Sequence, residues 1–176
     1  ERVRGLDVQA RVAWPLGSGR MSLGVTYAHL IERSRRDFIG GPNNDFTGRF
    51  DAIRDQGNVE LALDLDAFSF GYNARILGAA LKGTSAANLA AVSDDPALPG
   101  NNSNRISAYV YHDLQATFRP AEEYSLTLGV KNVADRQPPL ITSFSNSGLS
   151  GSASVTAGGI YDVRGRFFYA QIGVEF

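Results

Sequence analysis

The side chains best able to bind a metal or transfer a proton are few in this sequence and lie far apart. His29 and His112 are the only histidines, and neither has a carboxylate at metal-ligand spacing. The absence of cysteine excludes disulfides and thiolate metal sites. Asp94 and Asp95 could offer oxygen ligands to a hard cation, although two adjacent acids are also common in a solvated loop. The sequence therefore predicts no cofactor and no bound metal, and Asp94 and Asp95 stay as candidate ligand-binding residues.

Enzymatic and nucleic-acid-binding functions find little support in the sequence. Ser150 lies in a Gly-Leu-Ser-Gly stretch that lacks the spacing of a nucleophile elbow. The glycine-rich segments are not followed by a helical pattern, so they do not form a phosphate-binding loop. The net charge of −1 provides no basic excess for a nucleic-acid surface. We therefore predict that the chain is not an enzyme and has no nucleic-acid partner.

The elements that must position any site are strands, because apolar residues recur at every second position along seven segments. In the last segment the apolar parity consists of Phe168, Ala170, Ile172, Val174 and Phe176, whereas the other parity is mixed and polar. Six segments upstream repeat this pattern, and their apolar sets begin at Leu6, Met21, Val59, Phe68, Leu114 and Tyr124. No run of 18 apolar residues exists, so a transmembrane helix is excluded. A membrane β-strand needs only alternate apolar residues, because only one face meets lipid.

The connections between these segments alternate between short and long. Residues 15–19, 66–68 and 120–123 are short connections, whereas 37–55, 82–104 and 135–159 are long and rich in Gly, Asn, Ser and Pro. This alternation is typical of an outer-membrane barrel with tight periplasmic turns and long, mobile external loops. Five aromatic residues on the apolar parity lie beside a short turn or the chain end: Trp14, Phe68, Phe118, Tyr124 and Phe176. We interpret them as a periplasmic girdle, with a row of core aromatics as the alternative.

The predicted fold is therefore all-β, an antiparallel up-and-down transmembrane β-barrel of which about seven strands are present. Seven strands cannot close a bacterial barrel of even strand number, and an open sheet would leave unpaired edges in lipid. The inward parity carries small residues, which we expect to leave space for an internal domain. These residues are Gly24, Ser69, Gly71, Gly129 and Gly173.

Three segments near the end of the chain resemble a known family. They are 111–118, then 126–135 with Pro138 and Pro139, and the final stretch 161–176. In this order they are similar to the end of TonB-dependent receptors, in which a strand ending in Asn-(apolar)-(apolar)-Asp precedes the last external loop. The resemblance implies a parent barrel of 22 strands with a plug. Residues 1–176 would be its C-terminal segment, without the plug domain or the TonB-interacting segment.

The resemblance also implies a function and partners. The parent would be a receptor in the outer membrane of a Gram-negative bacterium for TonB-dependent uptake of a metal chelate, siderophore or saccharide. Its partners would be outer-membrane lipid and lipopolysaccharide, the remaining barrel and plug, the barrel-assembly machinery, and TonB through the missing N-terminal part. The assembly machinery would read a terminal signal made of Phe168, Ile172, Val174 and Phe176. A passive porin-like channel and a soluble β-sandwich binding module remain the alternatives.

Three arginines are the most specific candidates for contact with a ligand. Arg33, Arg35 and Arg36 follow the second strand segment and enter a long connection. Their guanidinium groups could bind an anionic ligand or lipopolysaccharide phosphates through charge-assisted hydrogen bonds. Solvated loop charges are the alternative, and Arg164 and Arg166 before the last strand pose the same question.

Overall fold

The computed structural model describes residues 1–81, 105–142, 154–156 and 160–175. Asp94, Asp95, Ser150 and Phe176 lie outside the described residues, as do large parts of the second and third long connections. No helix among the described residues is long and apolar enough to cross a membrane.

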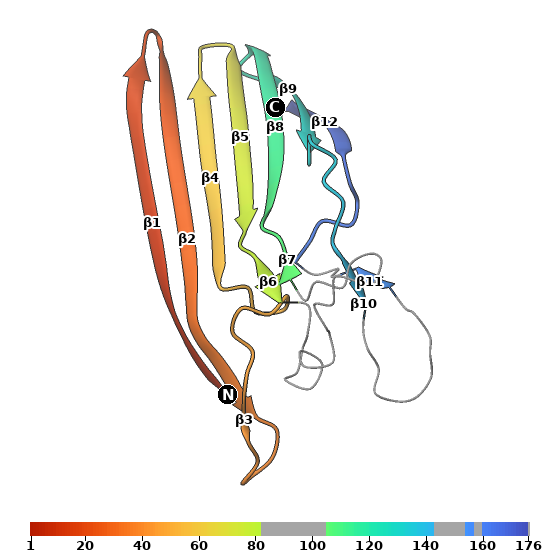
Figure 1. Ribbon diagram of the computed structural model, residues 1–176. Helices are drawn as coiled ribbons and strands as arrows, with labels where there is room; N and C mark the ends of the chain where they lie inside the picture. Colours follow the sequence, from red (N-terminus) through yellow and green to blue (C-terminus); the bar gives the residue numbers. More distant parts are fainter. Residues whose placement is uncertain (82–104, 143–153, 157–159, 176) are drawn as a thin grey trace.

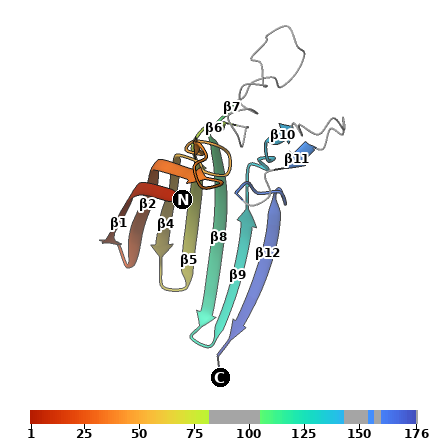
Figure 2. The ribbon, with the colours of Figure 1, turned by 90° about the horizontal axis from the view of Figure 1, so that it is seen from below.

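One antiparallel sheet contains all the long strands, and its spatial order follows the chain (Figure 1). The order is β1 (Arg2–Leu16), β2 (Gly19–Arg36), β4 (Asp55–Asp64), β5 (Phe68–Leu77), β8 (Tyr109–Ala121), β9 (Tyr124–Lys131) and β12 (Phe167–Val174). Figure 2 shows that the sheet curves from β1 to β12 like a section of a wall. The predicted all-β class, the antiparallel up-and-down order and the seven main strands are therefore confirmed.

Five short strands lie toward the end of the sheet where the long connections are. Strand β3 (Asn43–Asp45) extends the sheet by pairing with the end of β2. The other four form two small ladders, which pair β6 (Ala80–Leu81) with β7 (Arg105–Ile106), and β10 (Leu140–Thr142) with β11 (Ser154–Thr156). We call this end of the sheet the loop end, and the opposite end, with the three short connections, the turn end.

The turn end is built from tight hairpins. Leu16 pairs with Gly19, so only Gly17 and Ser18 connect β1 to β2. Gly17 has a φ of 61°, which a residue without a Cβ adopts at little cost and which the first position of a two-residue hairpin can require. The turns before β5 and β9 are similarly short.

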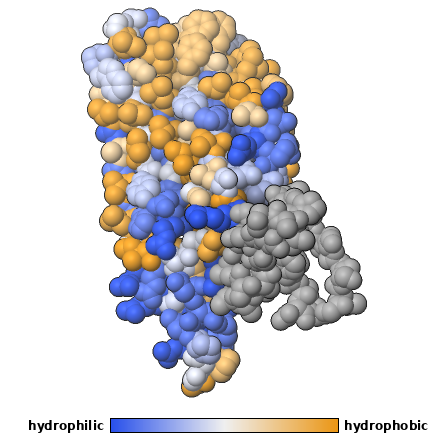
Figure 3. Space-filling view, in the orientation of Figure 1, coloured by the Kyte–Doolittle hydropathy of each residue, from blue (hydrophilic) through white to orange (hydrophobic). Residues whose placement is uncertain are grey.

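The two faces of the sheet differ as the alternation predicts. Large apolar side chains point away from one face and are exposed, with Leu128 at 54% and Ile172 at 77%. We call this the apolar face and the opposite one the polar face. Hydrophobic residues gather over the upper half of the strands in Figure 3, and hydrophilic residues cover the loop end near β3. A soluble β-sandwich would bury such an apolar face, and no described element covers it.

A small apolar core lies at the loop end instead. It consists of Ile53, Leu77, Ala80, Ile106, Tyr111 and Tyr161. Leu77 and Tyr111 belong to the polar face of β5 and β8, because Leu77 pairs with Tyr109 and Arg75 pairs with Tyr111. The other members come from the connections, so this loop-end core fixes the bases of three connections against the polar face.

Candidate ligand-facing wall

A β-bulge decides where the three candidate arginines lie. Gly5 pairs with Leu30, but Arg4 pairs with Glu32, so Ile31 is the extra residue. Beyond the bulge Arg33 pairs with Val3, which shares its parity with Gly5 on the polar face. Arg33 and Arg35 therefore follow the polar face, and Arg36 follows the opposite one.

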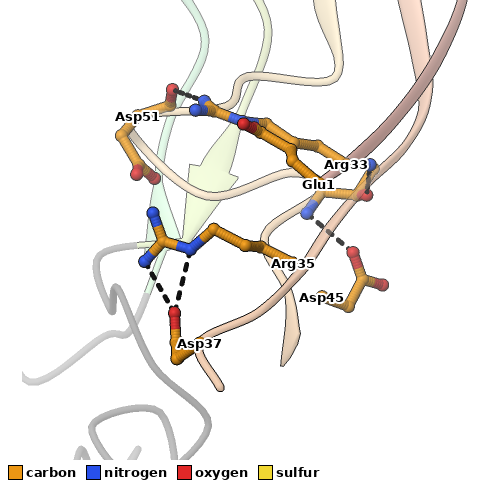
Figure 4. A network of polar contacts seen from close by, with 7 residues as sticks. Glu1, Arg33, Arg35, Asp37, Asp45 and Asp51 are labelled. Carbon is orange, nitrogen blue, oxygen red and sulfur yellow. Dashed lines mark hydrogen bonds and ion pairs between the residues drawn. The ribbon is translucent and has the colours of Figure 1, made fainter. Parts of the chain in front are cut away.

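Arg33 and Arg35 are both engaged with acceptors of their own chain (Figure 4). Arg33 donates from Nε to Glu1 Oε1 at 3.0 Å and from Nη1 to the carbonyl oxygen of Asp51 at 3.1 Å. Both Nε and Nη2 of Arg35 lie 2.9 Å from Asp37 Oδ1. The hydrogen bond from Arg33 lowers the pKa of Glu1. These residues line a pocket of about 370 Å³. Its lining contains as many acids as arginines, so it has no excess of positive charge to attract an anion.

The strand-to-loop junction below these arginines is also held by polar contacts. The backbone N–H of Arg33 donates to Thr47 Oγ1 at 2.8 Å, and the N–H of Thr47 donates to Asp45 Oδ1 at 2.9 Å. The contacts from Thr47 lower the pKa of Asp45. Among the described residues, Arg36 has no hydrogen bond or ion pair from its side chain. The structure thus brings Arg33 and Arg35 together and leaves Arg36 apart, and a ligand-binding role for the three remains a prediction.

The polar face near the loop end carries a groove of about 710 Å³. Its polar lining comes from four neighbouring strands and consists of Asp7, Gln9, Thr26, Gln56, Asn58 and Arg75. Gln9, Thr26, Asn58 and Arg75 lie in one row across the sheet, because each pairs with the next. Sequence reasoning missed this row, since its members are unremarkable until the register aligns them.

Two guanidinium groups stack on tyrosine rings beside the groove and the loop-end core. Arg75 lies 4.8 Å from the centre of the Tyr111 ring, and Arg136 lies 4.5 Å from that of Tyr109. Such stacking holds the guanidinium plane while leaving its edge donors available. Tyr111 Oη accepts a hydrogen bond from the N–H of Asp162, and burial raises the pKa of Tyr161 to about 12.

Two glycines on the polar face, Gly71 and Gly129, lie under side chains of neighbouring strands, whereas space for an internal domain stays a prediction. A Cβ at Gly71 would lie 2.9 Å from Gln115 Cγ, and one at Gly129 would overlap the Tyr169 ring. Tyr169 Oη in turn donates to Gln115 Oε1 at 3.1 Å. Side chains from neighbouring strands therefore lie over these two glycines, and a larger residue at either position would displace them.

Both histidines lie on the apolar face close to the loop end, each beside a tyrosine. His29 Nδ1 is 2.7 Å from Asp55 Oδ1, to which Tyr27 Oη donates at 2.6 Å. Tyr72 Oη is 2.8 Å from His112 Nδ1. His29 is eleven residues after Ser18, and His112 is ten residues before Glu122. About ten residues of a tilted strand span the ~25 Å height of an apolar membrane band, so both pairs fit the border of such a band on the side of the loop end.

The Asn-Val-Ala-Asp sequence after β9 forms a polar junction between three segments. Asn132 has a φ of 51° and is buried; its N–H donates to Asp113 Oδ1, and its Oδ1 accepts from the N–H of Arg136, both at 2.8 Å. Asp135 Oδ1 accepts from the N–H of Arg166 at 2.8 Å, which positions the start of β12. Arg166 also donates from Nε to the carbonyl oxygen of Val133 at 3.0 Å. No cluster of three or more His, Cys, Asp or Glu side chains suited to a metal occurs in the described part of the chain.

An up-and-down sheet with one exposed apolar face and one polar face defines a section of a membrane-type β-barrel wall, and comparison with known proteins gives the family. Residues 1–133 match the family described as TonB dependent receptor-like, beta-barrel. The chain therefore belongs to the TonB-dependent receptor β-barrel family. The comparison with curated protein sequences gave no match.

Two solved structures share the fold, and both are mutants of the ferric enterobactin receptor from Pseudomonas aeruginosa. The R480A/Q482A mutant has a TM-score of 0.64 at 18% identity, and the G324V mutant has 0.62 at 19%. In each case the alignment covers 99% of this chain and 22% of the receptor. The chain thus spans about a fifth of the length of these receptors.

Proposed function

We propose that this chain is the C-terminal wall of an outer-membrane receptor that takes up a nutrient with energy from TonB. The observation that carries the proposal is that one sheet with the fold of this family has an exposed apolar face on one side and a polar face on the other. The apolar face exposes Leu128, Phe168 and Ile172 as lipid contact requires, and the polar face carries hydrogen-bonding side chains toward an interior. The polar face is then the luminal face, the turn end is periplasmic and the loop end is external.

The partners follow from the same arrangement. Strands β1 and β12 are edges of the sheet, so each must pair with further strands of the same barrel in lipid. The luminal face would contact a plug domain, and TonB would act through that part of the receptor. Outer-membrane lipid and lipopolysaccharide would contact the apolar face, and the receptor would reside in the outer membrane of a Gram-negative bacterium as a transporter rather than an enzyme.

The terminal strand supports a proposed assembly signal. Phe168, Ile172 and Val174 all extend from the apolar face of β12 and are exposed, where a second protein can read them. Phe176 would complete this set, which we propose to be recognised by the barrel-assembly machinery.

Uptake measurements on the full receptor that contains this chain test the function. Cells that express the receptor should take up its nutrient only when TonB is present, because the lumen is closed by a plug at rest. The purified receptor should show no steady conductance in planar bilayers. TonB-independent uptake together with an open conductance would favour the porin-like alternative.

A further inference from the structure

The luminal groove near the loop end presents hydrogen-bonding groups in a regular ladder. Gln9 on β1, Thr26 on β2, Asn58 on β4 and Arg75 on β5 are successive partners in one row. Neighbouring strands lie about 4.8 Å apart, so the polar groups repeat at that interval across the sheet. Gln56 adds a third amide side chain, from the adjoining row. A ladder of this kind suits an elongated ligand that offers polar groups at regular steps.

The polar groups of this ladder are available for a ligand. The side chains of Gln9, Thr26 and Gln56 are exposed and have no hydrogen-bond partner among the described residues. Arg75 lies over the Tyr111 ring and has no carboxylate partner in the described part of the chain. By contrast, Asn58 already donates to Glu60 Oε1 at 3.0 Å, which fixes its orientation. Some polar groups of the groove are therefore held in place by the protein, and others have hydrogen-bonding capacity left for a ligand.

The charge of the groove selects among ligand classes. Among the described residues that line the groove, Asp7 is the only acid and Arg75 the only base, so this lining is neutral overall. An anionic metal chelate would need several unpaired cations to offset its desolvation. Amide and hydroxyl groups both donate and accept, which matches sugar hydroxyls, and Leu77 with Ile160 gives the groove an apolar end for carbon–hydrogen faces.

We propose that this groove binds a neutral, hydroxyl-rich ligand of the oligosaccharide class. The inference rests on the proposed receptor function and narrows it to one substrate class. The amides of Gln9 and Gln56 each supply donors and an acceptor, and Arg75 on β5 supplies donors only. The arginines Arg33 and Arg35, which are paired with acids, stand outside this recognition.

Calorimetric titration of the full receptor in detergent tests the substrate class. The probes are maltohexaose, xylohexaose and mannohexaose as neutral oligosaccharides, and ferric enterobactin as an anionic chelate. At least one neutral probe should bind, and Gln9→Ala and Gln56→Ala should each weaken it about three- to tenfold. Gln171→Ala is the matched control, because Gln171 is an exposed luminal glutamine on β12 outside the groove, and it should bind with unchanged affinity.

Other outcomes overturn the inference in distinguishable ways. Binding of ferric enterobactin alone, or of none of the neutral probes, would show that the class is wrong. A lower melting temperature in the Gln9 and Gln56 variants with unchanged affinity would mean that the groove holds the plug rather than a ligand. Energy-dependent uptake of a chelate would leave the receptor function intact, whereas loss of TonB dependence for every probe would refute the receptor function itself.

Discussion

Arg11 of β1 and Glu60 of β4 form an ion pair across the intervening strand β2, with 3.3 Å between Nη2 and Oε2. Gly24 pairs with both residues and lies between them, so no side chain blocks the contact. Alternate strands of a sheet are about 10 Å apart, a distance that a long arginine can span here because no bulky side chain lies between the two charges. A glycine on the luminal face therefore allows side chains of two strands that are not direct neighbours to meet above it.

This pair should depend on the size of residue 24. A Cβ at Gly24 would lie 3.6 Å from Glu60 and 3.7 Å from Arg11, so alanine should fit, whereas Gly24→Leu should separate the charges. Both side chains are largely exposed, so a double-mutant cycle with Arg11→Ala and Glu60→Ala should give at most about 1 kcal/mol, declining with salt. The cycle should give no coupling in the Gly24→Leu background. An unchanged coupling there would show that the pair forms around residue 24 by another path.

A second luminal glycine should tolerate even less. The Tyr169 ring covers Gly129, so Gly129→Ala forces the ring away and breaks its hydrogen bond to Gln115. We expect the free energy of unfolding of the full receptor to fall by about 1–3 kcal/mol, as is usual when an extra group is forced into a packed site. Adding Tyr169→Ala should recover most of this loss, because the overlap then disappears. A double variant as unstable as the Gly129→Ala single variant would show that the cost comes from the backbone and not from the ring.

The apolar face should reject charge. Leu63 and Leu128 occupy one row across the sheet, joined through Phe70 and Ala116. Leu128→Arg should destabilise the receptor in lipid by about 2–4 kcal/mol if the row lies near the bilayer midplane. Gln171→Arg on the opposite face of β12 should cost far less. Refolding into vesicles with urea titration measures both costs, and a cost for Gln171→Arg as large as that for Leu128→Arg would contradict the assignment of the apolar face to lipid.

Asn132 should be hard to replace, because it combines a left-handed backbone with buried hydrogen bonds. Asn132→Ala loses the bonds to the backbone of Arg136 and strains the backbone, so we expect a loss of about 2–4 kcal/mol. Asn132→Gly also loses the side-chain hydrogen bonds but does not strain the backbone, so its stability should lie between that of the Asn132→Ala variant and that of the native protein. If the glycine and alanine variants proved equally stable, the left-handed conformation would contribute nothing.

Tyr161 should give the loop-end core a pH dependence in the alkaline range. Its pKa of about 12 is above the ordinary value of 10, because burial disfavours the ionised form. The folded core therefore keeps this contribution below pH 10 and loses it as the pH rises toward 12. Its hydroxyl has no hydrogen-bond partner among the described residues, so Tyr161→Phe should not reduce stability at pH 7. The variant should also show a flatter decline between pH 10 and 12 in thermal unfolding.

The strand pattern was readable from the sequence, because the alternation that separates the two faces is local. Leu126, Leu128 and Val130 reveal their face by spacing alone, and the short connection at 120–123 fixes the direction of the next strand. The resemblance near Asn132 and Asp135 likewise pointed to the family, although the hydrogen bonds that explain those residues came only with the fold. Arg33, Arg35 and Arg36 appeared as one group in the sequence. The bulge at Ile31 places Arg33 and Arg35 on the polar face, and the alternation of side chains along the strand places Arg36 on the opposite face.

What the tertiary structure decided depends on contacts between residues far apart in the chain. The register placed Gln9 in a row with Arg75, and it placed Tyr169 over Gly129. The loop-end core joined Ile53 to Tyr161, which no period in the sequence relates. A repeat of two residues determines which face a side chain takes, but not which residue lies beside it, because neighbours across a sheet are set by hairpin lengths, bulges and long-range packing together.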